Sequence, residues 1–149
     1  MLHKIIESKM EHKVELARTI AETAHDGQYI CKRDGVTPYI THVNNVVELL
    51  EGSEAKIVGY LHNTLEMSDY TYKDLIKEGI PAYLVAAIIT LTLTENQSHI
   101  DYIMKIRQSK LATKVKIAEI VINLTNEPTY KQIQYYTKML TILSKKGGD

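Results

Sequence analysis

Apolar residues recur along the chain at the spacing of helix faces, so the pattern predicts a protein built from helices. In a helix, residues three or four positions apart lie on one face. The clearest such faces are Val14–Ala24 in a helix from about Ser8, Val43–Leu50 in "ITHVNNVVELLEG", Ile100–Arg107, Leu111–Ile122 and Ile133–Leu143. We therefore expect an all-α chain.

Residues that favour helix starts and stops stand between these stretches. Serine and threonine cap first turns, glycine follows last turns, and proline fits a first turn because it lacks an N–H. The candidates are Gly52, Ser53, Thr71, Gly79, Pro81, Ser98 and Thr129. The helix that begins at Ser53 contains "VGYLHNTLEM", and the stretch "HDGQYICKRDGVTPY" is a loop before the second helix.

The segment "YLVAAIITLTL" is rich in β-branched residues, so local propensity alone also allows a strand there. Its eleven residues lack clear alternation, which favours a buried helix, and they are too few to cross a bilayer. The pattern predicts about seven or eight helices in one compact helical domain over residues 1–149. Residues 145–149 are expected to form a frayed tail.

Charge and cysteine content narrow the expected partners and cellular location. The 149 residues carry 18 Lys and Arg against 18 Asp and Glu, which argues against extended nucleic acid or a membrane surface as partners. Cys31 is the single cysteine, so no internal disulfide is expected and an intracellular setting fits best. The first residues, "MLHKIIESKMEHK", lack a hydrophobic signal core. We expect a cytoplasmic protein.

Several polar side chains interrupt the apolar faces, and they are the candidates for chemistry. They are His42, His62, Asn63, Glu66, Glu119 and Asn123. Imidazoles and carboxylates that converge from separate helices suit a divalent metal with open water positions. Taken singly, each histidine is also explained as an ordinary core or surface residue. Glu119 is likewise explained as a solvated or capping carboxylate. His62 and Glu66 also fit a surface pair at i,i+4, so spacing leaves both interpretations open.

Three segments in order resemble the HD-domain metal-dependent phosphohydrolases, in particular the hydrolase domain of RelA/SpoT proteins and the small alarmone hydrolases. "AHDGQYICKRDGVTPYITHV" is similar to the family's "H-x-G-Q…R-K-x-G-x-P-Y-I-x-H-P". "GYLHNTLEMSDYTYKDL" is similar to "A-L-L-H-D-x-x-E-D-T-x-x-T-x-x-x-L", and "VKIAEIVINLTN" to "V-K-L-A-D-x-x-x-N". The last helix, with "YYTKMLTIL", also resembles the closing helix of that group. The match runs from about Ala21 to Asn126, and it implies an HD-domain helical fold.

The resemblance also implies a site. In the family a metal, usually manganese, is held by the histidine of P-Y-I-x-H, the H-D pair and the aspartate of K-L-A-D. It activates water that cuts the pyrophosphate from the 3′ oxygen of (p)ppGpp-like nucleotides. Carried onto this chain, the metal positions are His42, His62, Asn63 and Glu119. Glu66 would position or deprotonate the water, and Lys32, Arg33 and Asn123 would contact the nucleotide.

Departures from the motifs fall within that implied site. Asn63 replaces the aspartate of H-D, Glu119 the aspartate of K-L-A-D, and Met67 the second acid of E-D. Val43 replaces a proline, and the basic pair stands in swapped order. An amide oxygen is a weaker ligand than a carboxylate, so hard divalent ions should bind less tightly. Met67 also removes a carboxylate that would help handle the water proton.

Two functions follow from these departures. We expect weak or lost metal-dependent hydrolysis, with the domain serving as a nucleotide-binding or interaction module. The alternative is an active phosphohydrolase that cuts a nucleotide phosphate ester or pyrophosphate, using Mn²⁺ or another divalent metal in an altered site. The expected partner is a nucleotide or another phosphate-containing small molecule, because the basic loop suits phosphate, although such loops are often merely solvated. A buried polar network would also explain His42, His62 and Asn123. The sequence is also compatible with a homo-oligomer.

Overall fold

The computed structural model describes residues 1–30 and 36–145, and these residues form α-helices without a β-strand. The helices are α1 (Leu2–Ala24), α2 (Tyr39–Glu48), α3 (Ser53–Leu61), α4 (Thr64–Met67), α5 (Tyr72–Glu78), α6 (Ala82–Thr90), α7 (His99–Arg107), α8 (Lys110–Leu124) and α9 (Tyr130–Ser144). The all-α prediction is confirmed, and α4 is a single turn. An isolated bridge between Tyr29 and Pro38 closes the base of the loop before α2.

Local capping signals set several helix ends as predicted. Thr71 accepts the N–H of Asp74, and the Asp74 carboxylate accepts the N–H of Thr71, which completes a capping box for α5. Gly79 ends the same helix at φ +111°, a conformation that favours glycine. Thr129 forms a second capping box, at the start of α9. These ends depend on residues close in sequence, so they could be predicted without the fold.

Three boundaries differ from the sequence prediction. α1 begins at Leu2 rather than near Ser8. Gly52, at φ +89°, is the N-cap residue of α3, and Ser53 is the first helical residue rather than its cap. The helix predicted to run through "VGYLHNTLEM" is interrupted at His62 and Asn63, so α3 and α4 are separate. This interruption places two polar side chains at a helix junction, where they contact residues from other helices.

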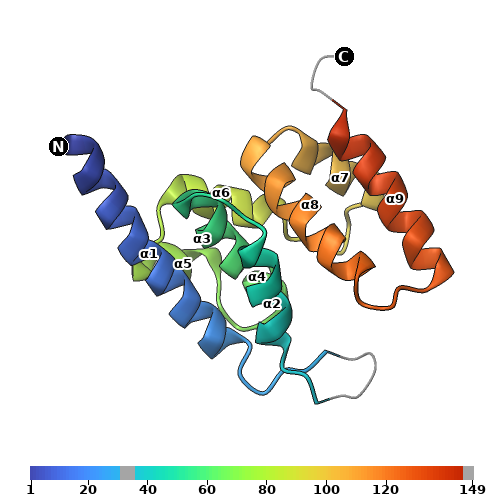
Figure 1. Cartoon of the computed structure of the whole chain (residues 1–149), viewed down its shortest axis with the longest axis horizontal. Coiled ribbons are helices and arrows are strands. Elements are labelled where there is room, and N and C mark those ends of the chain that lie inside the picture. The colour runs from blue at the N-terminus through green and yellow to red at the C-terminus, as the bar shows by residue number, and fades with distance from the viewer. Residues whose placement is uncertain (31–35, 146–149) are drawn as a thin grey trace.

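α3 lies at the centre of the fold. It packs against α1, α2, α6 and α8, and its Ile57, Val58 and Leu61 are fully buried. Figure 1 shows α1 along one side of the molecule and the group α7, α8 and α9 at the other. α6, which covers most of "YLVAAIITLTL", is a core helix as predicted, with Leu84 and Ile88 fully buried. Among the described helices, none combines the length and the apolar character needed to cross a bilayer.

Gly59 allows a close approach between α2 and α3. A Cβ atom at this position would lie 2.5 Å from the Leu50 Cδ1 and 3.2 Å from the Val47 Cγ2. Because both neighbours are buried, a side chain here would push the two helices apart. The glycine carbonyl also accepts a hydrogen bond from His62, so this contact links the core to the polar junction after α3.

Candidate functional site

The two histidines at the predicted metal positions lie next to each other inside the fold. His42 belongs to the first turn of α2, and His62 directly follows α3; both side chains are buried. Their ring centroids are 6.1 Å apart. The Nδ1 of His62 donates to the Gly59 carbonyl at 2.6 Å, since a carbonyl oxygen only accepts. The Nε2 of His62 is therefore the ring atom that faces the other site residues.

The Nε2 of His62 meets residues from two further positions of the predicted site. The amide nitrogen of Asn63 lies 3.0 Å from it and also donates to the Tyr39 hydroxyl at 2.5 Å. The Oε2 of Glu119, from α8, lies 3.3 Å from the same Nε2. The fold thus brings together side chains from three separate segments of the sequence, at residue 42, residues 62 and 63, and residue 119.

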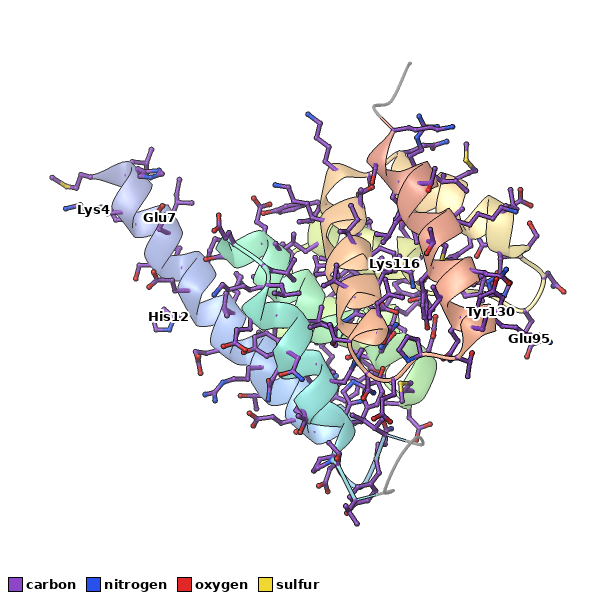
Figure 2. All side chains as sticks on the ribbon, turned by 45° about the vertical axis from the view of Figure 1, so that its right-hand side comes forward. Lys4, Glu7, His12, Glu95, Lys116 and Tyr130 are labelled. Atoms are coloured by element: carbon purple, nitrogen blue, oxygen red, sulfur yellow. The ribbon has the colours of Figure 1, made fainter. Side chains whose placement is uncertain are left out.

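Glu119 is also paired with a buried lysine that the sequence analysis did not assign to the site. The Nζ of Lys116 donates to the Glu119 Oε1 at 3.1 Å and lies 5.2 Å from the ring centroid of Tyr102. Lys116 is 7% exposed, and Figure 2 labels it within the helical body. The sequence feature that could have assigned Lys116 to the site is the i,i+3 spacing within "VKIAE", which places the lysine and the glutamate one turn apart.

This pair fixes the charge of Glu119. Burial by itself would raise the pKa of the Glu119 carboxyl, but Lys116, followed by His62 and His42, outweighs burial and lowers it to about 2. Burial likewise opposes the charge of Lys116, and its contact with Glu119 raises the pKa above its ordinary value. The site therefore holds a carboxylate and an ammonium whose formal charges cancel.

Further polar and aromatic groups extend the cluster toward α1. His25, at the end of α1, is 4.9 Å from the Tyr39 ring, and Tyr39 is 5.2 Å from the His42 ring, measured between centroids. The Nδ1 of His25 lies 2.8 Å from the Gln28 Oε1, and the Gln28 amide donates to the Met67 carbonyl at 2.5 Å. The three segments that carry the family resemblance therefore contact one another directly in the fold.

A cavity of about 300 Å³ opens beside this cluster. Its walls are Tyr29, Ile30, Tyr39, His42, Met67, Glu119, Asn123, Asn126, Gln132 and Tyr136. The volume is at the lower end of the range for small-molecule sites, which is about 300–1,000 Å³. Three tyrosine rings and three amide side chains in its walls can contact a flat polar ligand by stacking and hydrogen bonding. Asn123 thus lies where a bound ligand would touch it.

The predicted catalytic residue does not line the cavity, and the basic pair of the loop lies outside the described residues. Glu66 is exposed, and its Oε1 accepts the backbone N–H of Leu93 at 2.7 Å, after α6. Met67, which replaces the second acid of the motif, is the member of this pair that lines the cavity. Lys32 and Arg33, like Cys31 and most of the predicted tail, lie outside the described residues.

As arranged, the four predicted metal positions fit a divalent ion poorly. Asn63 presents its amide nitrogen to His62, and Glu119 is engaged by both Lys116 and His62. Within residues 1–30 and 36–145, no three His, Cys, Asp or Glu side chains form a group suited to hold a metal. An aspartate at position 63 would give the cluster a net negative charge, whereas Asn63 leaves it neutral. Glu119 is thus already bound by Lys116, and Asn63 by Tyr39.

The buried histidines predict a pH-dependent stability. Burial, with a smaller contribution from His62, lowers the pKa of His42 to about 4, and burial also lowers that of His25. Between pH of about 6.5 and 4 the unfolded chain binds protons that the folded chain does not. The free energy of unfolding should therefore fall as the pH falls through this range, by about 3 kcal/mol for His42. Urea unfolding between pH 7 and 4 measures this slope.

The control for this slope is His42→Gln, which keeps a polar side chain and removes the titrating group. Its stability should depend less steeply on pH than that of the wild type, with the remaining slope due largely to His25. An unchanged slope in His42→Gln would show that the proton uptake occurs elsewhere.

Comparisons with known proteins agree with the fold. No family model and no curated protein matches this chain. A solved structure does: a metazoan ortholog of SpoT, described as hydrolysing ppGpp and playing a role in starvation responses. It aligns with a TM-score of 0.74 and 20% identity over 91% of this chain and 88% of that chain. The expected resemblance to the RelA/SpoT hydrolase domain is therefore confirmed at the level of the fold.

Proposed function

We propose that this chain is an HD-type domain that binds a nucleotide or another phosphate-containing small molecule, with weak or lost metal-dependent hydrolysis. The single observation that carries the proposal is the Lys116–Glu119 ion pair in contact with His62, beside a neutral amide at Asn63. A metal would have to enter a cluster without net negative charge and compete with these contacts. Ligand binding in the adjoining cavity needs no such rearrangement.

The nature of the ligand is supported by the fold and by the cavity. The solved SpoT ortholog, whose fold this chain shares, is described as acting on ppGpp. In the cavity, Tyr29, Tyr39 and Tyr136 offer rings for stacking on a base, and Asn123 offers an amide for its polar edge. Lys32 and Arg33 would contact the phosphates, as the resemblance implies.

A second candidate keeps the hydrolase activity in an altered form. It is favoured by the convergence of His42, His62 and Glu119, which supplies two imidazoles and a carboxylate within one cluster. With Asn63 these residues would hold the metal, and Glu66 would have to leave Leu93 to reach the water. We rank this candidate second because its donor set would have to give up the contacts to Lys116 and Tyr39.

Ligand binding should appear as thermal stabilisation without turnover. Saturation at about a hundred times Kd adds about 2.7 kcal/mol and raises Tm by several degrees. The measurement is a thermal melt with ppGpp and with a panel of nucleoside mono-, di- and triphosphates. Tyr136→Ala removes a cavity wall and should abolish most of the shift, whereas Tyr130→Ala, exposed on the same helix, should keep it.

Metal analysis and an activity assay on the wild-type protein distinguish the binding module from the enzyme. Protein purified without chelators is analysed for bound metal and then assayed with Mn²⁺ for phosphate or pyrophosphate release from each nucleotide. Stabilisation without metal or release supports the binding module. Metal-dependent release that is lost in His62→Ala would instead support the enzyme candidate. An absence of both binding and turnover would refute both candidates.

A further inference from the structure

Gln28 connects the end of α1 to two residues that line the cavity, although it is not among the cavity walls itself. It is half-buried, in the segment that follows α1. Its backbone carbonyl accepts the N–H of Tyr39, the first residue of α2, at 2.8 Å. Its side-chain amide nitrogen donates to the carbonyl of Met67, the last residue of α4, at 2.5 Å. One residue thus holds two cavity walls from behind.

The contacts of Gln28 also fix which way its amide points. The amide nitrogen donates to the carbonyl of Met67 and, at 3.3 Å, to that of Ala24 at the end of α1. The Oε1 atom therefore faces His25, whose Nδ1 lies 2.8 Å away and donates its proton. The buried His25 ring in turn packs against the Tyr39 ring, 4.9 Å away between centroids. Gln28 thus reaches Tyr39 through His25 as well as through the backbone.

Met67 depends on this support because it stands between two open spaces. It lines the cavity, and it also lines a second hollow of about 400 Å³, to which Gln28 belongs. Met67 is only half-buried, so apolar packing covers it incompletely. Its N–H donates to the Asn63 carbonyl at 3.0 Å, and its own carbonyl accepts from Gln28. Without Gln28, the end of α4 would lose its hydrogen bond to the segment that follows α1.

We propose that Gln28 is a positioning residue of the ligand cavity, which holds Met67 and Tyr39 where a bound ligand meets them without touching the ligand. The inference rests on the proposed function, since it concerns the cavity in which we place the nucleotide or other phosphate-containing ligand. A binding site is precise only when the residues behind its walls are held by packing and hydrogen bonds. Loss of the Gln28 amide should therefore weaken ligand binding in a chain that still folds.

Gln28→Glu and Gln28→Leu remove the bond to Met67 in two ways. Glutamate keeps an oxygen that accepts from His25, but its carboxylate has no N–H for the Met67 carbonyl, whereas leucine removes both contacts. Each variant should bind ligand about tenfold more weakly than the wild type, because one net hydrogen bond corresponds to a factor of up to about ten. The probes are ppGpp and the nucleoside mono-, di- and triphosphates of the thermal panel, with Kd measured by isothermal titration.

Lys13→Leu is the matched control. Like Gln28, Lys13 is half-buried and joins α1 to a carbonyl at the end of another helix, that of Gly79 after α5, at 2.8 Å. It is not among the cavity walls. Lys13→Leu should lose stability in urea unfolding as the Gln28 variants do, but keep the wild-type ligand affinity. An equal loss of affinity in Lys13→Leu would show that Gln28 acts only through general stability, and would overturn the proposal.

The wall at Met67 can also be followed without a ligand. In protein with isotope-labelled methionine methyl groups, the NMR signal of Met67 should shift in Gln28→Glu and stay in place in Lys13→Leu. An unchanged Met67 signal in Gln28→Glu overturns the proposal, and so does wild-type affinity in both Gln28 variants. A shifted Met67 signal, in a chain whose wild type binds none of the nucleotides, would refute the proposed function while supporting Gln28 as the residue that positions this wall.

Discussion

Asn63→Asp combined with Met67→Asp should give this chain a Mn²⁺ affinity at least about tenfold above that of the wild type. In the wild type the amide nitrogen of Asn63 faces His62 and Tyr39. Aspartate replaces that donor with an anionic oxygen, which adds a hard ligand and gives the cluster a net negative charge. Met67 lines the cavity, so its replacement places a second carboxylate where water and ligand would lie.

Two measurements follow the metal independently of activity. Isothermal titration gives the affinity, and thermal melts with and without Mn²⁺ give the stabilisation. Without metal the double variant should be less stable than the wild type, because the added acid lies close to Glu119, and Mn²⁺ should reverse that loss. Asn126→Asp is the matched control, because it adds a carboxylate to the cavity wall away from the predicted metal positions.

The results of these measurements distinguish a decayed metal site from a site of another design. Metal binding by Asn63→Asp with Met67→Asp, but not by Asn126→Asp, would mean that these two substitutions are enough to create a metal site like that of the HD-domain phosphohydrolases. Equal affinities in the wild type and the double variant would contradict the argument from ligand charge. Recovered nucleotide hydrolysis would further support the proposal that Asn63 and Met67 together weaken hydrolysis in the wild type.

Lys116→Met should destabilise the protein by about 3–5 kcal/mol, the usual cost of removing one partner of a buried ion pair. The variant leaves the Glu119 carboxylate inside the fold without its ammonium partner, and His62 remains in contact with it. Methionine keeps most of the aliphatic length that packs near Tyr102, so the loss reflects charge rather than a cavity. Urea unfolding at pH 7 measures the difference in the free energy of unfolding.

Glu119→Gln in the same chain should recover much of that stability. The double variant Lys116→Met with Glu119→Gln holds no unpaired charge at the site, so its cost should be well below the sum of the single changes. A matched surface control is Lys114→Met, two residues earlier on α8 and exposed, which should change stability by less than about 0.5 kcal/mol. If Lys116→Met were as mild as Lys114→Met, Glu119 would not depend on this lysine for its charge.

The fold class and many helix boundaries were determined by the sequence itself. Helix faces repeat every three or four residues, and capping boxes such as Thr71 with Asp74 join residues within one turn. Such signals are local, so they can be recognised without knowing what a helix packs against. The family motifs added the positions of His42, His62, Asn63 and Glu119, and the fold brings these four positions together.

Contacts between distant segments were decided only by the tertiary structure. At the interruption between α3 and α4, Asn63 donates to Tyr39, 24 residues away. Lys116 is an ordinary polar residue in sequence, and burial beside Tyr102 and Glu119 makes it the cation of the site. Glu66 similarly binds Leu93 rather than facing the cavity. A side chain's charge and hydrogen-bond partners depend on the dielectric and the neighbours around it, and packing alone supplies both.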